Sequence, residues 1–164
     1  MVSMDDLMGQ VFANARFDNI RGVQLGVNPS EIEQIEKRKG EKDVYFINYF
    51  IPIVSFGSIE VNYQCYNPNV IDKITLFLSA DLANQEAIET FDAFSKELSY
   101  RLDSELGKPK KEKHKGDVNI EPTTYWVNNS AIPPLEIIKF VYYDDLSGGN
   151  NKIVKIILRY YEPD

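Results

Sequence analysis

The sequence has few of the residues that build metal centres and many catalytic sites. It contains one Cys and one His in 164 residues, so no disulfide can form within the chain and a typical zinc or copper site is excluded. No apolar run approaches the roughly 20 residues of a membrane-spanning helix, and the N-terminus has no basic region followed by an apolar one. We therefore expect a cytoplasmic protein that forms its core without disulfides, metals or cofactors.

Basic residues are also in the minority. The chain has 18 Lys and Arg against 25 Asp and Glu, a formal net charge of −7, with 43% hydrophobic and 26% charged residues. This composition is typical of a soluble globular domain. The acidic balance argues against nucleic-acid binding and favours a basic protein partner. We expect a single domain over residues 1–164, as a monomer or homodimer, with no nucleic-acid or membrane partner.

Helical spacing of apolar residues predicts three helices. The second has the clearest start, because Asn28 can cap it, Pro29 suits its first position and Glu31 completes a capping box. The third and longest should begin after Asn84 and end at Gly107. The predicted helices cover residues 4–16, 28–39 and 85–106, and the expected core face of the last consists of Ala87, Phe91, Phe94, Leu98 and Leu102.

Alternating apolar residues separated by turn sequences predict six strands. The first is apolar on both faces, which favours a central position, whereas the second has one polar face. The predicted strands begin at Val44 and cover roughly 44–51, 59–66, 74–79, 123–127, 135–143 and 152–161. Between the third helix and the fourth strand, residues 108–115 carry a net charge of +4, and we expect a solvated loop there.

A faint internal repeat relates the two halves of the chain. The segment 45–48 (YFIN) matches 125–128 (YWVN) in kind, and each is followed by an Ile-Pro pair. A later pair, 73–76 (KITL) and 155–158 (KIIL), begins the last strand of each half. This similarity suggests a tandem helix-strand-strand-strand duplication over 28–80 and 84–162. We expect an α+β fold with a mostly antiparallel sheet of about six strands and helices packed on one face.

The reactive side chains do not form a recognisable catalytic set. His114 lies in the lysine-rich segment, where a solvated role is favoured, and Cys65 shares the alternation of buried strand residues. Asp144 and Asp145 could contribute oxygen ligands to a weak calcium site, but a hairpin loop explains them better. We therefore predict no catalytic, metal or cofactor residues and no enzymatic activity.

Aromatic residues on the predicted strands are the more informative feature. Neighbouring residues of a strand point to opposite faces, so one member of each aromatic pair should reach the face without helices. Tyrosine is enriched at protein interfaces, although it also favours strands for reasons unrelated to binding. The candidate partner-binding residues are Tyr63, Tyr66, Trp126, Tyr142, Tyr143, Asp144 and Asp145.

The pattern of the chain resembles small bacterial α+β immunity proteins of polymorphic-toxin and contact-dependent competition systems. The resemblance lies in residues 23–32 (VQLGVNPSEI), which open a helix, and in 91–109, a long amphipathic helix that ends in LGKP before an aromatic strand. It covers most of the chain as a pattern, without a diagnostic motif. The resemblance implies a cytoplasmic inhibitor that binds a toxin domain and blocks its active site.

A second hypothesis stays open beside this one. The chain could be a small-ligand-binding or enzyme domain whose pocket lies between the helices and the sheet. Such a domain would be distinguished by a pocket that holds several buried polar groups. Self-association through the sheet is a third possibility.

Overall fold

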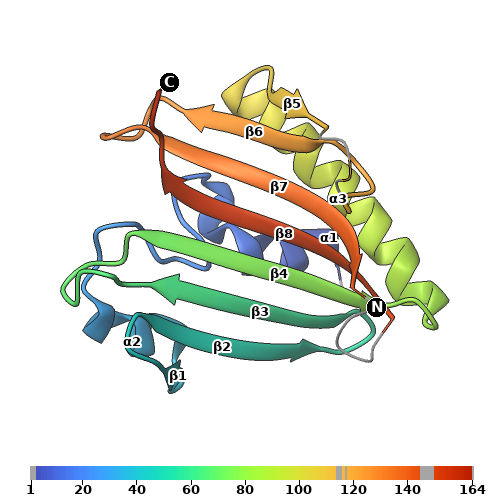
Figure 1. Cartoon of the computed structure of the whole chain (residues 1–164). Helices are drawn as coiled ribbons and strands as arrows, with labels where there is room; N and C mark the ends of the chain where they lie inside the picture. Colours follow the sequence, from blue (N-terminus) through green and yellow to red (C-terminus); the bar gives the residue numbers. More distant parts are fainter. Residues whose placement is uncertain (1–2, 114–115, 117, 145–149, 164) are drawn as a thin grey trace.

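The protein is built on one antiparallel sheet of eight strands (Figure 1). The computed structural model describes all residues except 1–2, 114–115, 117, 145–149 and 164. The strand order is β1-β2-β3-β4-β8-β7-β6-β5, and all neighbours are antiparallel. The strands are β1 (Glu41–Lys42), β2 (Phe46–Ile53), β3 (Gly57–Gln64), β4 (Lys73–Asp81), β5 (Lys110–Glu112), β6 (Thr123–Asn128), β7 (Leu135–Asp144) and β8 (Asn151–Tyr160).

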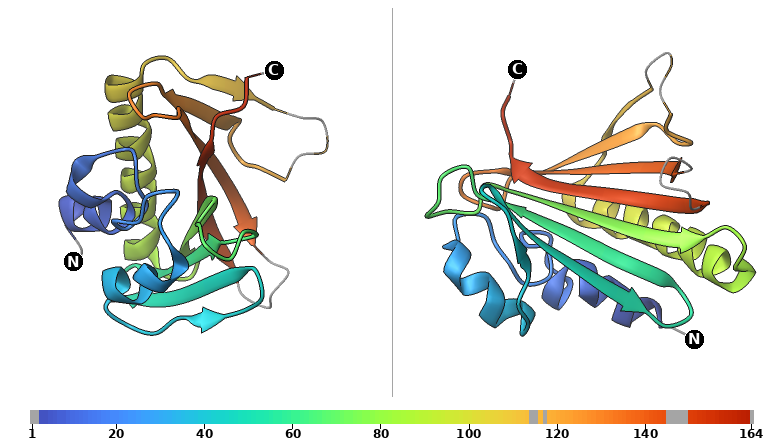
Figure 2. Two further views of the ribbon diagram at one scale, coloured as in Figure 1. Left: turned by 90° about the vertical axis from the view of Figure 1, so that its left-hand side faces the viewer. Right: turned by 60° about the horizontal axis from the view of Figure 1, so that its bottom comes forward.

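The helices cover one face of this sheet and leave the other face without a helix (Figure 2). They are α1 (Met4–Val11), α2 (Ile32–Glu36) and α3 (Gln85–Leu106), with short 3-10 turns at Ala13–Ala15 and Pro29–Glu31. The core lies between the two layers, where Leu76 of β4 and Val154 of β8 are fully buried together with Phe91 and Phe94 of α3. No described helix combines the length and apolar character needed to span a bilayer.

Most of this architecture is predicted by the sequence pattern. The α+β class, the antiparallel sheet and the helix over 85–106 are confirmed, and all six predicted strands occur within a few residues of their expected bounds. Asn84 caps α3, its side chain accepting from the Ala87 backbone N–H at 3.1 Å. All five residues of the expected α3 core face are buried.

Three expectations need correction. The sheet has eight strands because short edge strands, β1 and β5, extend it on both sides, and β5 occupies part of the expected lysine-rich loop. The strand β2 is not central. Its neighbour on one side is the two-residue edge strand β1, which pairs only with Ile47 and Asn48. The first two helices are shorter than predicted, since the chain turns with positive φ at Asn14 and at Lys37.

The two expected units form the two halves of the sheet. Each half contains a helix followed by four strands, and the halves meet where β4 pairs with β8 over nine residues. The duplication itself stays a hypothesis, but the order of elements in the two halves is the same. One hydrophobic core cluster includes residues of both halves. The single domain over residues 1–164 stays a prediction.

A buried ion pair attaches α2 and the segment before it to the sheet. The Arg21 guanidinium binds the Glu36 carboxylate at 2.9 Å, and Glu36 also accepts a hydrogen bond from the Tyr63 hydroxyl of β3. Burial, followed by the nearby negative charge of Glu36, raises the pKa of Tyr63. The phenol therefore stays protonated and acts as a donor to the carboxylate.

The turn into β3 gives a test of the sheet packing. A Cβ atom at Gly57, where φ is +147°, would lie 2.0 Å from the Ser79 backbone oxygen, whereas one at the exposed Gly9 of α1 would meet nothing within 4 Å. We expect Gly57→Ala to reduce the free energy of unfolding by more than about 2 kcal/mol. Gly9→Ala should increase it by about 0.5–1 kcal/mol through helix propensity. Urea denaturation measures both, and equal stabilities of the two variants would contradict this packing.

Candidate functional site

Two of the predicted partner-binding residues lie inside the core. Tyr63 and Trp126 alternate with the outward residues of β3 and β6 and point toward the helices, where both are buried. A protein partner cannot contact them in this structure. Their role is internal, because Tyr63 donates to Glu36 and the Trp126 indole N–H donates to Asp103 of α3 at 2.8 Å.

Among the described residues, the other predicted ones are closer to solvent but do not form one patch. Tyr142 is half-buried on the face without helices, while the adjacent Tyr143 is exposed and has the helix-side orientation. Tyr66 is exposed in the turn after β3, where its ring packs edge-on against that of Tyr45 at 5.2 Å between centroids. Asp144 ends β7 and is half-buried. Asp145 lies outside the described residues, as does His114.

The uncovered face of the sheet carries aromatic and aliphatic side chains among polar and charged ones. At its centre, Lys155 of β8 lies between Phe77 of β4 and Phe140 of β7, with its ammonium 5.7 Å and 5.1 Å from the two ring centroids. Burial and the nearby Lys73 lower the pKa of Lys155. The uncovered-face aromatics, the name used below for this set, are Phe46, Phe50, Phe77, Tyr125, Phe140 and Tyr142.

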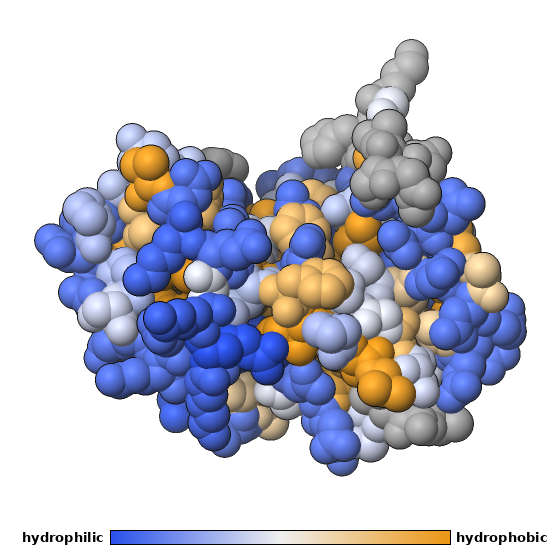
Figure 3. All heavy atoms as spheres, turned by 90° about the horizontal axis from the view of Figure 1, so that it is seen from below, coloured by the Kyte–Doolittle hydropathy of each residue, from blue (hydrophilic) through white to orange (hydrophobic). Residues whose placement is uncertain are grey.

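The edge of the sheet formed by β1 and β2 carries exposed apolar side chains on β2 and next to its ends. Seen from this edge, apolar side chains gather across the middle of the molecule between hydrophilic ones (Figure 3). Phe50 leaves 61% of its surface exposed on β2, and Val44 and Val54 at the two ends of this strand are also exposed. These exposed apolar residues are spread along β2 from one end to the other.

The charges on the uncovered face are mixed and not uniformly acidic. Lys73, Lys155 and Arg159 point to this face together with acidic neighbours, and Arg159 forms an ion pair with Glu136 at 2.7 Å. The acidic character is stronger on α3, which carries six Asp or Glu and two Lys or Arg. The negative field of the protein therefore originates mainly from the helix side.

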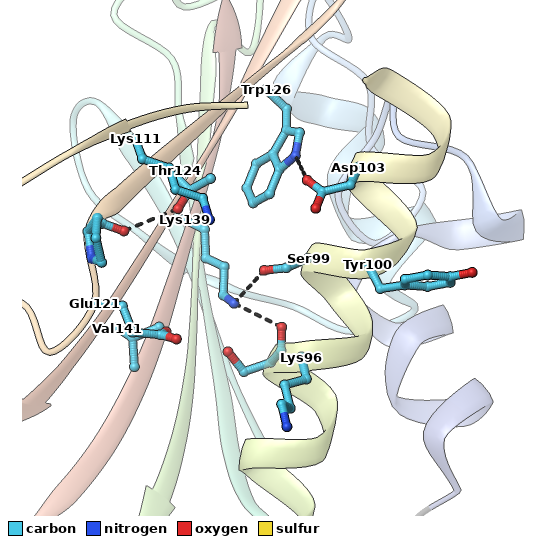
Figure 4. A pocket seen from close by; sticks show the side chains of 12 residues that line it. Lys96, Ser99, Tyr100, Asp103, Lys111, Glu121, Thr124, Trp126, Lys139 and Val141 are labelled. Carbon is cyan, nitrogen blue, oxygen red and sulfur yellow. Dashed lines mark hydrogen bonds between the residues drawn. The ribbon is translucent and has the colours of Figure 1, made fainter. Parts of the chain in front are cut away.

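A pocket lies between α3 and strands β6 and β7, which is the location that the ligand-binding hypothesis expected (Figure 4). It has a volume of about 370 Å³, within the size range of small-molecule sites. Its lining residues are Ser95, Lys96, Ser99, Tyr100, Asp103, Lys111, Glu121, Pro122, Thr124, Trp126, Lys139 and Val141.

Lys139 is the unusual member of this pocket. Only 6% of the residue is exposed, and its ammonium donates to the Ser95 backbone oxygen at 2.9 Å and to Ser99 Oγ at 2.8 Å. Among the described residues, no carboxylate forms an ion pair with it. Burial lowers the pKa of Lys139 to about 8, a change that Glu121 opposes and Lys111 reinforces. A lysine with this pKa can serve as an anion-binding ammonium or, when neutral, as a nucleophilic amine.

The sequence analysis did not identify Lys139, although a signal was present. It is the one charged residue in the run from Ile137 to Val141, and its position in the alternation puts it on the same face as these two buried residues. A lysine in the apolar phase of a strand is costly unless it has partners. This energetic cost is the signal in the sequence that indicates a functional or specifically bonded lysine at position 139.

The other chemistry-bearing residues form no site in the described chain. Cys65 is buried, and burial together with Asp72 raises the pKa of its thiol, which disfavours the reactive thiolate. Within the described residues, no group of three His, Cys, Asp or Glu side chains is placed to hold a metal ion.

Comparison with protein-family models, with curated proteins and with solved structures yields no match for this chain. The two surfaces must therefore be interpreted from their own geometry. One is the uncovered sheet face with its aromatic side chains, and the other is the Lys139 pocket on the opposite face.

The lowered pKa of Lys139 predicts a pH dependence of stability. Its pKa is about 8 in the folded protein and 10.5 in an ordinary environment, so between these values the unfolded chain binds a proton that the folded chain has released. Raising the pH through this window should stabilise the wild type relative to Lys139→Met by up to about 3 kcal/mol. Urea denaturation between pH 7 and pH 11 measures the difference.

The exposed Lys42→Met variant is the control for this experiment, because it removes the same charge from an edge strand. Its stability should follow that of the wild type across the pH range. A difference between wild type and Lys139→Met that does not change with pH would contradict the buried ammonium.

Proposed function

We propose that this protein is a non-enzymatic protein-binding module and, more concretely, an immunity-type inhibitor that occludes a basic toxin domain. The observation that carries the proposal is the uncovered sheet face, on which the uncovered-face aromatics are half-buried or exposed on four strands. Aromatic side chains supply large contact areas at a low entropic cost, and they dominate the energetics of many interfaces.

The proposed mechanism is steric occlusion. A broad sheet face can lie across the active site of another protein and exclude its substrate. The central pair Phe77 and Phe140, with Lys155 between them, would form the dry middle of such an interface. Charged residues such as Glu60 and Lys73 would form its rim.

The acidic surface supports a basic partner. The net charge is −7 and the excess of acidic residues is largest on α3, so a basic protein would be attracted before contact is made. The mixed charges on the uncovered face would then align the two proteins without opposing the approach. Attraction and contact are thus assigned to different parts of the surface.

Capture of the partner tests the proposal first. Tagged protein is incubated with lysate of the native cell at low and at high salt, and bound proteins are identified by mass spectrometry. We expect one stoichiometric basic protein whose toxic activity is suppressed when the two purified proteins are mixed. Recovery of no partner, together with a monomer by light scattering, would contradict the proposal, and a stable dimer would favour self-association instead.

Two adjacent tyrosines of β7 give a matched test of the face that binds. Tyr142 points to the uncovered face and Tyr143 to the helix side, so the same substitution removes the same side chain from opposite surfaces. Tyr142→Ala should weaken the complex at least about 10-fold, as for a hot-spot residue. Tyr143→Ala should change the affinity less than about 3-fold. Calorimetry with the purified partner measures both, and equal effects would remove the uncovered face from the proposal.

The salt dependence of association tests the steering by α3. Stopped-flow measurement of the association rate should show a decrease of about 10-fold or more as salt is raised, with a smaller change in the dissociation rate. The double variant Glu86→Gln/Glu89→Gln, in the first turns of α3, should associate more slowly at low salt and equally fast at high salt. An association rate independent of salt would contradict the electrostatic part of the proposal.

A further inference from the structure

We propose that the pocket between α3 and strands β6 and β7 binds a small organic carboxylate, with the Lys139 ammonium as its main anchor. This site is separate from the proposed protein interface, because Lys139 points to the helix side of β7 whereas the uncovered-face aromatics point away from it. Failure of either proposal therefore leaves the other intact.

The lining of this pocket carries more positive than negative side chains. Ammonium groups have three donors, and Lys139 uses two of them, on the Ser95 oxygen and Ser99 Oγ. The pocket is lined by three lysines, Lys96, Lys111 and Lys139, but by only two carboxylates. One of these carboxylates, Asp103, already accepts the Trp126 indole N–H at 2.8 Å. The lining thus has an excess of one positive charge, which one carboxylate would balance.

Lys139 and Ser99 together provide two hydrogen-bond donors at one place in the pocket. Ser99 Oγ accepts from Lys139, so the hydroxyl hydrogen of Ser99 is available to a ligand oxygen. The Lys139 and Ser99 side chains converge between the helix and the sheet (Figure 4). Two donors of different elements that converge on one place suit the two oxygens of a carboxylate.

The remaining lining indicates an organic ligand and not a bare inorganic anion. Val141 and Pro122 are apolar parts of the wall, and Trp126 contributes its indole. A volume of about 370 Å³ is larger than an anion alone would fill. At the surface, the exposed residues Lys96 and Lys111 would attract the negatively charged group. The lowered pKa of Lys139 agrees with an ammonium that lacks a counter-ion.

The chain contains its own reporter for this site. Trp126 is its one tryptophan and lines the pocket, so its fluorescence responds to occupancy there without interference from another indole. The test titrates the wild-type protein with benzoate, with the neutral isostere benzamide and with inorganic phosphate at pH 7. We expect a saturable change of fluorescence with benzoate in the millimolar range or below, and at least 10-fold weaker binding of the other two compounds.

The outcomes of this titration separate the parts of the proposal. An equal response to benzamide would overturn the role of charge, and an equal affinity for phosphate would overturn the assignment to an organic ligand. No saturable response to benzoate would overturn the site itself. Benzoate and benzamide have nearly the same shape, so their comparison needs no variant and does not depend on the folding of one.

Two variants then assign the effect to Lys139. Lys139→Met keeps an unbranched side chain that is one heavy atom shorter and removes the charge, and we expect it to weaken benzoate binding at least 10-fold. Ser99→Ala should weaken it several-fold, whereas Lys42→Met on the distant edge strand β1 should leave it unchanged. Heteronuclear NMR spectra of each variant confirm the fold before titration. Unchanged affinity in Lys139→Met would overturn the assignment even if benzoate binds.

Discussion

The antiparallel pairing of β4 with β8 is the interaction on which the rest of the structure depends. It extends over nine residue pairs and is the one place in the sheet where strands distant in the sequence, 73–81 and 151–160, lie side by side. The other strand pairs join neighbours along the chain. Because the β4–β8 pairing places Leu76 opposite Ile156 and Leu78 opposite Val154, it merges the apolar strips of the two halves into one surface. The helices can then cover that surface as a single layer.

That constraint explains why the two faces of the sheet differ. On the helix side the middle of β4, β8 and β7 is aliphatic apart from Lys139, which takes its partners from α3, and Lys152 at the end of β8 also reaches α3 through Asp92. On the other side, the same strands carry Phe77, Lys155 and Phe140 in contact. The two lysines illustrate the same physical rule in opposite settings. Lys139 is stabilised by hydrogen bonds in a closed layer, and Lys155 by aromatic rings near solvent.

Local patterns were sufficient to predict the three helices, six of the eight strands and the class of the fold. Asn84 and Asn28 marked real caps, and the alternation in residues 59–65 gave the buried face of β3 correctly. The strand order could not be predicted, because pairing of β4 with β8 is a contact between distant segments. The position of β2 was misjudged for the same reason, since Phe46 and Phe50 on its second face are not covered by the sheet's own helices.

The candidate sites could be predicted less well than the fold, because they depend on which face of the sheet the helices cover, and local sequence patterns do not contain this information. Tyr63 and Trp126 were chosen for their residue type, but their phase in the strands puts them in the core. The alternation predicted that Tyr142 and Tyr143 point to opposite faces of the sheet. Which of them points away from the helices could be decided only once the positions of the helices were known. Lys139 was missed because a single lysine in a strand is unremarkable until α3 is known to lie over it.

The segment that precedes α2 has a mechanical consequence. It is held to one half of the sheet by Arg21 on Glu36 and by the Gly26 N–H on the Ile71 oxygen, and to the other half by Asn128, which donates to the Phe17 oxygen at 2.9 Å. This segment, called the clasp below, thus connects the two halves beside the junction between β4 and β8. Force that separates β4 from β8 would have to release the clasp as well, so the halves should yield together as one mechanical unit.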